Sequence, residues 1–227
     1  MKRNACLFYI LFSLLTVCAN AQNKVTEPKK TNARPTPTSE AAAEPFDKAD
    51  VKTMSAKCVR FDTEAGMIEA EMFPESAPET VRNFLNLTAI GAFDTTTFSR
   101  VVPDFVIQGG NLWSGEKMTV ELGKRARKTI PDEPNKILHQ RGILSMARSH
   151  QPNSATTDFF ILVGDAPHLD GTFAAFGRVT RGMDVVDKIN KAPVTDEKPE
   201  KPVKITKASI VPCTASPIQI VIFLFPA

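Results

Sequence analysis

Short apolar runs follow one another along the chain from about residue 59 onward, and Gly, Pro or Asp interrupts most of them. Runs of this length that are rich in Val, Ile and Phe are typical of β-strands, and Gly and Pro mark the turns between them. Many short strands with few helices favour a closed barrel. The expected strands lie at 59–61, 67–73, 97–103, 105–110, 142–147, 159–163, 173–179 and 203–211.

Two segments have the period of a helix instead. The first begins near Pro78, which suits the first helical position, and Glu79 suits the positive end of the helix dipole. Its apolar stripe includes Phe84, and Gly91 is expected to end it. The second helix covers 182–189. The sequence therefore predicts a mainly β fold, a closed antiparallel eight-stranded β-barrel capped by two helices.

The N-terminus has the pattern of an export signal. Lys2 and Arg3 give a positive start, and residues 7–17 form an apolar run that is too short to span a membrane. The small residues of Ala-Asn-Ala at 19–21 are typical of a cleavage site. We therefore predict a signal peptide over 1–21 and an exported, periplasmic protein.

Cys18 allows a second interpretation of this leader. A lipidated cysteine would anchor the mature protein to a membrane, but Val17 is bulkier than the residue that usually precedes such a site. Simple cleavage after Ala21 is the interpretation that the residues favour, and lipid anchoring through Cys18 is the alternative.

Composition divides the rest of the chain into three parts. Residues 22–56 are rich in Pro, Thr, Ala, Lys and Glu, and a segment with so few large apolar residues is expected to be a flexible linker. The folded domain is expected over 57–213. Residues 214–227 form an apolar tail whose role the sequence does not indicate, and it is too short for a spanning helix. We expect no membrane-spanning segment in the mature chain.

The charge and histidine patterns exclude two classes of protein. Formal net charge is only +3, and the most basic stretch, at 124–128, has acidic residues on both sides. Nucleic-acid binding needs a clustered basic surface, so no nucleic-acid partner is expected. The three histidines match no metal-ligand spacing, and we expect neither a metal nor a cofactor.

Several blocks of residues carry a resemblance to a known family. One contains Phe, Arg, Pro, Phe, Gln and a Gly pair in order at 98–110, and the others lie at 77–84, 141–148, 153–161, 169–171 and 176–179. In this order the blocks resemble the cyclophilins, a family of peptidyl-prolyl cis-trans isomerases. The resemblance covers about 57–213, and its Met-Ala-Arg and Ser-Ala-Thr forms are similar to the bacterial, exported branch.

The resemblance implies a catalytic group and a substrate pocket. Arg100 would act on the prolyl nitrogen. Gln108 would orient the Arg100 side chain, and Phe105 would complete the catalytic set. Substrate-binding residues by the same resemblance are Val106, Ala147, Arg148, Asp158, Phe160, His168, Leu169 and Phe173. The backbone of Ala147 and Arg148 would bond the residue before proline. The expected partners are proline-containing segments of unfolded or folding proteins, and the expected state is a monomer.

The chemistry explains why an arginine suits this position. Rotation about a peptide bond has a barrier of roughly 18–20 kcal/mol, and uncatalysed prolyl exchange takes tens to hundreds of seconds. In the twisted transition state the nitrogen lone pair becomes a hydrogen-bond acceptor, so a donor aimed there stabilises that state selectively. A guanidinium is always charged and has several donors. No nucleophile, metal or cofactor is required.

Three positions depart from the family pattern. Asp158 stands where the family commonly has Gln, and it could form a salt bridge with Arg100 or Arg148. His168 stands where Trp or Phe is frequent, and Phe173 where His or Tyr is frequent. These departures bear on substrate preference and rate more than on the activity itself.

Cys58 and Cys213 are the cysteines that remain after removal of the predicted signal peptide. They lie near the start of the first expected strand and the end of the last, and those strands are neighbours in the cyclophilin fold. The resemblance therefore makes Cys58–Cys213 a disulfide candidate, in keeping with export to an oxidising compartment.

Other functions stay open on the sequence alone. Outside the motif, Arg100 would be an ordinary surface ion-pair residue, and Phe105, Phe160 and Phe173 would be plain core residues. A cyclophilin fold with a weakened site could act as a proline-peptide-binding chaperone or scaffold with little turnover, and a barrel that binds an unrelated small ligand is a third possibility. An activity assay on Arg100→Ala separates the first two.

Overall fold

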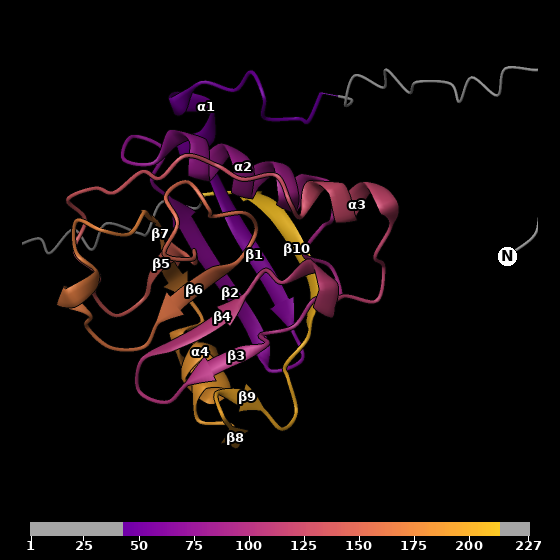
Figure 1. The fold of residues 1–227 in the computed structure, drawn as a ribbon, viewed down its shortest axis with the longest axis vertical. Coiled ribbons are helices and arrows are strands. Elements are labelled where there is room, and N and C mark those ends of the chain that lie inside the picture. Colours follow the sequence, from indigo (N-terminus) through magenta and orange to yellow (C-terminus); the bar gives the residue numbers. More distant parts are fainter. Residues whose placement is uncertain (1–42, 214–227) are drawn as a thin grey trace, which may run out of the picture. The chain divides into compact units, whose positions relative to one another are not determined.

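The computed structural model describes residues 43–213, and all eight predicted strands are present in this part of the chain. They form one antiparallel sheet in the order β10-β1-β2-β7-β5-β6-β4-β3, which curls around the core in Figure 1. The mainly β fold is thus confirmed. The strands are β1 Lys57–Thr63, β2 Gly66–Met72, β3 Arg100–Val102, β4 Val106–Gly109, β5 Ile143–Met146, β6 Phe159–Leu162, β7 Ala175–Arg181 and β10 Ile205–Pro212.

The two edges of the curled sheet meet at only one place in the described residues. β10 and β3 form no ladder with each other. Just before these strands, Thr97 and Lys204 form an isolated antiparallel bridge, and the Phe98 N–H donates to the Val203 carbonyl at 3.0 Å. The barrel expected from the sequence therefore takes the form of a curled eight-stranded sheet whose edges meet at this bridge.

Both predicted helices are present. Helix α2, Pro78–Ala89, starts at the predicted proline and ends just before Gly91, which has a left-handed φ of +70°. Helix α4, Met183–Asn190, buries Val186 and Ile189. In Figure 1 α2 lies across one end of the curled sheet and α4 lies near the other.

Phenylalanine rings fill the interior of the curled sheet. The ring of Phe84 on α2 lies 5.1 Å from that of Phe159 and 4.8 Å from that of Phe176, measured between centroids. The Phe61 ring stacks on Phe159 at 5.5 Å. Edge and stacked arrangements at these distances are the favoured ones for aromatic pairs. Six phenylalanine side chains are fully buried in this interior: Phe61, Phe84, Phe93, Phe98, Phe159 and Phe176.

A second, smaller apolar cluster lies apart from this interior and positions the site. Phe159 is fully buried in the main core, whereas its neighbour Phe160 belongs to the second cluster with Val106, Leu162 and Leu169. Successive residues of a strand point to opposite faces of the sheet, so β6 supplies one ring to each cluster.

Residues 43–56, which composition assigns to the flexible linker, pack on the domain instead. They include a short helix, α1 Val51–Ser55, in which Met54 is fully buried. The Arg82 guanidinium on α2 donates to the Phe46 carbonyl at 2.7 Å. Phe46 and Ala49 also pack against the core, and the Asn86 side chain on α2 accepts from the Phe46 N–H at 2.7 Å. Average composition missed them, so the folded part begins at residue 43 at the latest.

Several short elements were also missed by the sequence reasoning. They are too short to have a clear hydrophobic period. One is the two-stranded hairpin β8 Val194–Thr195 and β9 Lys198–Pro199, which matters for the site. The others are α3 Val120–Arg125, η1 Leu112–Ser114 and η2 Pro167–Leu169.

Cys58 and Cys213 form a disulfide, with Cα atoms 4.9 Å apart. The two cysteines are close because β1 and β10 are paired, with Cys58 opposite Val211. The cross-link joins residues 155 positions apart. By loop-closure entropy it stabilises the fold by about 5 kcal/mol.

The remaining predictions about the ends of the chain fall outside the described residues. They concern the signal peptide at 1–21, the linker at 22–42, lipidation of Cys18 and the apolar tail at 214–227. Within residues 43–213, no helix is both long enough and apolar enough to cross a membrane.

Candidate active site

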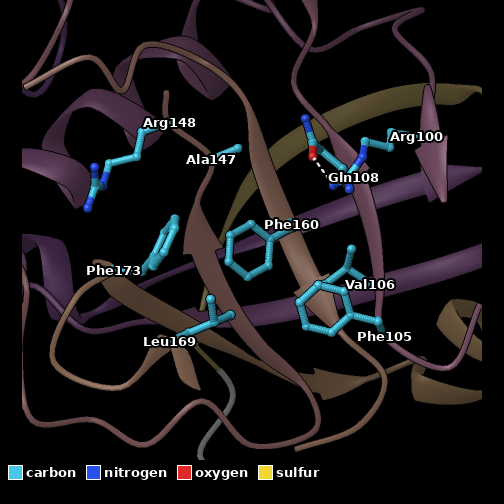
Figure 2. Close-up of a pocket in the computed structure, with 9 residues that line it drawn as sticks. All are labelled: Arg100, Phe105, Val106, Gln108, Ala147, Arg148, Phe160, Leu169 and Phe173. Carbon is cyan, nitrogen blue, oxygen red and sulfur yellow. Dashed lines mark hydrogen bonds between the residues drawn. The ribbon is translucent and has the colours of Figure 1, made fainter. Parts of the chain in front are cut away.

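A hollow of about 190 Å³ lies on the outer side of β4 and β6, above the second apolar cluster. Figure 2 shows Phe160 at its centre, with Arg100 and Gln108 on one side and Arg148 and Phe173 on the other. Its lining consists of nine residues: Arg100, Phe105, Val106, Gln108, Ala147, Arg148, Phe160, Leu169 and Phe173. The pocket thus has an apolar floor and a cationic group at each side.

Strand register brings Arg100 and Gln108 together. In the β3–β4 pair Arg100 lies directly opposite Gln108, and in the β4–β6 pair Gln108 lies opposite Phe160. The Arg100 Nη1 group donates to Gln108 Oε1 at 3.1 Å. Three residues far apart in sequence therefore become neighbours through two antiparallel ladders.

The Gly pair after Gln108 has a steric reason. Gly110 has a left-handed φ of +89°, and a Cβ at this position would lie 2.2 Å from the Thr157 carbonyl oxygen. The chain entering β6 therefore passes directly against Gly110. A side chain here would push β6, and with it Phe160, away from β4.

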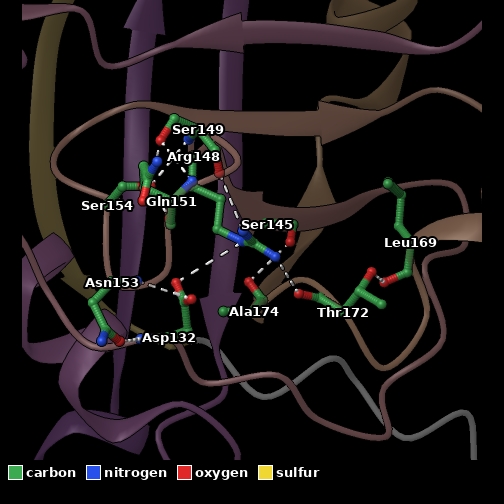
Figure 3. A network of polar contacts seen from close by, with 10 residues as sticks. All are labelled: Asp132, Ser145, Arg148, Ser149, Gln151, Asn153, Ser154, Leu169, Thr172 and Ala174. Carbon is green, nitrogen blue, oxygen red and sulfur yellow. Dashed lines mark hydrogen bonds and ion pairs between the residues drawn. The ribbon is translucent and has the colours of Figure 1, made fainter.

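Arg148 enters the pocket with its side chain, although the sequence reasoning assigned the function to its backbone. Its guanidinium lies over the Phe173 ring, 4.9 Å from the centroid, a geometry that favours a cation–π contact. Figure 3 shows the same guanidinium donating to backbone carbonyls, including that of Thr172 at 3.2 Å. Its Nε lies 3.9 Å from the Asp132 carboxylate, too far for a hydrogen bond.

The backbone beside this arginine is only partly available to a substrate. The Ala147 N–H already donates to the Asp158 carbonyl at 3.0 Å, so this N–H is not free to donate to a substrate. The Arg148 N–H has no partner within residues 43–213. A bound peptide would therefore find its backbone donor one residue later.

Asp158 makes neither of the ion pairs considered for it. The carboxylates within 4.0 Å of Arg100 and Arg148 in the described residues are those of Glu197 and Asp132, respectively. Burial raises the pKa of the Asp158 carboxyl above its ordinary value, and a hydrogen bond from the Gln108 side chain opposes that rise. Asp158 therefore contacts the pocket lining through Gln108.

His168 lies beside the pocket and not in its lining. It is exposed on η2, and its ring lies 5.6 Å from the Phe105 ring. Phe173, the third departure from the family pattern, does line the pocket and packs edge-on against Phe160 at 6.2 Å.

Glu197 is a neighbour of Arg100 that the sequence reasoning missed. Its Oε2 accepts from Arg100 Nε at 2.7 Å, and the two side chains are 50% and 41% exposed. Glu197 lies far from every motif block, and its position next to Arg100 depends on the β8–β9 hairpin. No sequence pattern pointed to it.

The described residues hold no group of three or more His, Cys, Asp or Glu side chains placed to bind a metal ion. What the pocket offers is an apolar floor, a fixed guanidinium and a free backbone N–H. Such an arrangement can bind a small apolar ring and donate hydrogen bonds to an adjoining amide.

Comparison with known proteins agrees with this geometry. Residues 58–210 match the family described as "Cyclophilin type peptidyl-prolyl cis-trans isomerase/CLD". The peptidyl-prolyl cis-trans isomerase CYP23 of Arabidopsis thaliana is 41% identical over 145 residues, covering 63% of this chain and 64% of that protein. A peptidyl-prolyl cis-trans isomerase of Acinetobacter baylyi is 37% identical over 163 residues, covering 67% of this chain and 84% of that protein.

A solved structure has the same fold. It is the cyclophilin type peptidyl-prolyl cis-trans isomerase of Cryptosporidium parvum, determined in the presence of the dipeptide Ala-Pro. It matches with a TM-score of 0.60 and 30% identity, covering 70% of this chain and 99% of that chain. This chain belongs to the cyclophilin-type peptidyl-prolyl cis-trans isomerases, and it is an isomerase of that class.

Proposed function

We propose that Arg100 is the catalytic residue and that the pocket holds a proline of a polypeptide substrate. The proline ring would lie on Phe160, between Val106 and Leu169. The amide nitrogen would then face the Arg100 side of the pocket. The observation that carries this proposal is a guanidinium held by Gln108 at the edge of an apolar hollow.

The mechanism follows from what changes as the prolyl bond twists. In the planar ground state the nitrogen lone pair is delocalised, and it offers nothing to a donor. In the twisted state the lone pair accepts a hydrogen bond, so the Arg100 N–H groups stabilise that state and leave the planar isomers unaffected. A hydrogen bond to a charged group contributes about 1.5–3 kcal/mol, which is a rate factor of roughly 10 to 150.

The rest of the pocket supplies positioning. Gln108 holds one edge of the guanidinium, and the free N–H of Arg148 would donate to the backbone of the residue before proline. The apolar floor excludes water from the ring and strengthens the hydrogen bonds made beside it. In Figure 2 Phe105 lies beside Val106, on the same side of Phe160 as Arg100.

We further propose that the enzyme is exported and assists the folding of exported proteins. Two features support this, the leader-like residues 1–21 and the disulfide between Cys58 and Cys213. Disulfides persist in oxidising compartments such as the bacterial periplasm. The intact mass of the mature protein tests the proposal, because cleavage after Ala21 and a lipid on Cys18 give different masses, and an uncleaved leader contradicts export.

A proline-binding protein with little turnover is the second candidate. The observation that favours it is Glu197, whose carboxylate occupies the Arg100 Nε and lowers the local positive charge. Arg100 still lines the pocket and has N–H groups that neither Glu197 nor Gln108 takes, and for that reason we prefer catalysis.

A protease-coupled assay with a short proline peptide separates these candidates. Arg100→Ala should lower kcat/KM about 100-fold, the usual cost of removing one transition-state donor. Arg60→Ala is the matched control, because Arg60 is also exposed and ion-paired but lies on β1 outside the pocket. Equal, negligible rates in the wild type and Arg100→Ala would favour the binding protein.

A further inference from the structure

The turn of the β8–β9 hairpin has an unusual backbone. Its two central residues, Asp196 and Glu197, have φ values of 50° and 62°, in the left-handed region. A two-residue hairpin turn of this kind usually contains Gly or Asn, and a glutamate there is held at a cost. Strain of this sort persists only where the surrounding contacts enforce it, so the contacts of Glu197 are informative.

Glu197 binds β3 through both its backbone and its side chain. Its carbonyl accepts from the Val101 N–H at 2.9 Å, which attaches the hairpin to the strand that carries Arg100. Its carboxylate then accepts from Arg100 Nε at 2.7 Å. The backbone contact fixes the position of the Glu197 main chain beside β3, and the side-chain contact fixes one edge of the Arg100 guanidinium.

The guanidinium is therefore held at two separate points. Glu197 takes the Nε donor and Gln108 takes one donor of Nη1. A planar group held at Nε and at Nη1 is unable to rotate about the axis of its side chain. Its remaining N–H groups keep one direction, which a long flexible arginine that is 41% exposed would not keep alone.

We propose that Glu197 is a positioning residue for isomerisation, acting through Arg100. The proposal rests on the catalytic role proposed above for Arg100. Glu197 fixes the orientation of the guanidinium, so that its free N–H groups point at the twisted prolyl nitrogen. Because both partners are about half exposed, solvent screens their attraction and the pair contributes little to stability. The contribution of Glu197 is directional.

Glu197→Ala tests the proposal, with kcat and KM measured separately on a proline peptide. Loss of orientation should lower kcat about fivefold and leave KM within twofold, because the planar substrate does not use the donor. Glu197→Gln keeps an acceptor oxygen without the charge, and it should restore at least half of the lost kcat. Glu200→Ala is the matched control, since this exposed glutamate follows the same hairpin without contacting Arg100.

A double-mutant cycle with Arg100→Lys adds a measurement that a merely structural role would not affect. Glu197→Ala should change kcat less than twofold in the Arg100→Lys background, because no fork remains to be oriented. The melting temperature of each variant tests for folding defects. Gln and Ala variants that lose kcat equally, an unchanged or raised kcat in Glu197→Ala, or the same fivefold loss in the Arg100→Lys background would each overturn the proposal.

The cycle also separates this proposal from the role of Arg100 itself. If Arg100→Lys has full activity, the planar fork is not needed and the positioning role fails, whereas full activity in Arg100→Ala would make the catalytic assignment fail as well. If Arg100→Lys loses activity and Glu197→Ala does not, only the positioning role fails.

Discussion

Arg100 and Arg148 stand on opposite sides of the same ring, Phe160, yet they are held in different ways (Figure 2). Arg100 has a carboxylate at 2.7 Å and a side-chain amide at 3.1 Å, and both are parts of rigid strand or hairpin contacts. The Arg148 guanidinium lies over the Phe173 ring and donates to backbone carbonyls, and the Asp132 carboxylate is 3.9 Å from its Nε.

These two arginines differ in what holds them, so residue type alone does not assign a role. The guanidinium of Arg100 is held at Nε and Nη1 and keeps other N–H groups that can still donate. This suits a group that must donate to one particular atom. The guanidinium of Arg148 lies over an aromatic ring and donates to loop carbonyls, which suits a residue that forms a wall of the pocket. The variants below should therefore separate the two sides by size of effect and by the parameter affected.

Apart from Arg100→Ala, the largest effect is expected for Arg100→Lys. Lysine keeps the charge and loses the planar fork, so the contacts to Glu197 and Gln108 are not both possible. We expect kcat/KM to fall about 50-fold, nearly all of it in kcat, as usual for a lost transition-state donor. Steady-state kinetics on a proline peptide measure this, and Arg60→Lys should match the wild type. A loss of less than threefold would mean that a positive charge at this position is sufficient for catalysis without the planar fork.

Gln108→Ala should have the second largest effect, about tenfold in kcat, because one of the two contacts of the guanidinium is lost. The same change removes a donor from the Asp158 carboxylate, whose pKa burial already raises. Gln108→Ala combined with Asp158→Asn removes that complication, since a neutral amide is cheaper to leave buried. Full activity in this double variant would argue that Glu197 alone holds Arg100.

Arg148→Met should have a smaller effect and a different character. Methionine keeps an apolar contact with Phe173 and leaves the backbone N–H in place. It removes the guanidinium from this wall of the pocket, so we expect the substrate to be held less well and the chemistry to be unaffected. We expect KM to rise about threefold with kcat unchanged. A fall in kcat comparable with that of Arg100→Lys would remove the distinction between the two sides.

The smallest effect concerns stability on the Arg148 side, through His139. This buried ring contacts Asp170 Oδ1 and Ser145 Oγ, each at 3.1 Å, and Ser145 in turn donates to the Ala174 carbonyl at 2.9 Å. Burial lowers the pKa of His139, while Asp170 opposes the change. The unfolded chain takes up this proton near pH 6.5 and the folded chain resists it, so stability falls as the pH drops below about 6.5.

His139→Gln checks this expectation. The loss of stability in the wild type is at most about 1.4 kcal/mol per pH unit. Thermal unfolding at pH 7.5 and pH 5.5 should show a larger decrease in Tm for the wild type than for His139→Gln. Parallel decreases in the two proteins would assign the acid sensitivity to other groups.

Much of the fold was predictable because the strands are bounded by strong local signals. Gly91 ends α2 where expected, and Phe159 and Phe160 face opposite clusters, as the strand period requires. What the sequence did not predict depends on single long-range contacts. Residues 43–56 are held in part by the Arg82 side chain, and the average composition of a segment does not reveal a contact from one distant residue.

The candidate site shows the same limit. The resemblance named all nine residues that line the pocket; eight lie inside the motif blocks, and Phe173 lies between two of them. The resemblance missed Glu197, and it left open whether Asp158 would form an ion pair with Arg100. The structure gives that position to Glu197, because a two-residue turn places it against β3. Ion pairs made by short hairpins have no periodic signal along the chain, so only the folded geometry reveals them.

The most direct test of the account is NMR exchange spectroscopy on a proline peptide, with wild type and Arg100→Ala at equal concentration. The method measures peptide binding and cis/trans exchange in one sample. The account predicts that Arg100→Ala binds the peptide within about threefold of the wild-type affinity while the catalysed exchange rate falls about 100-fold. Undiminished exchange in the variant would contradict the central claim, and so would a parallel loss of binding and exchange in a variant that is still folded.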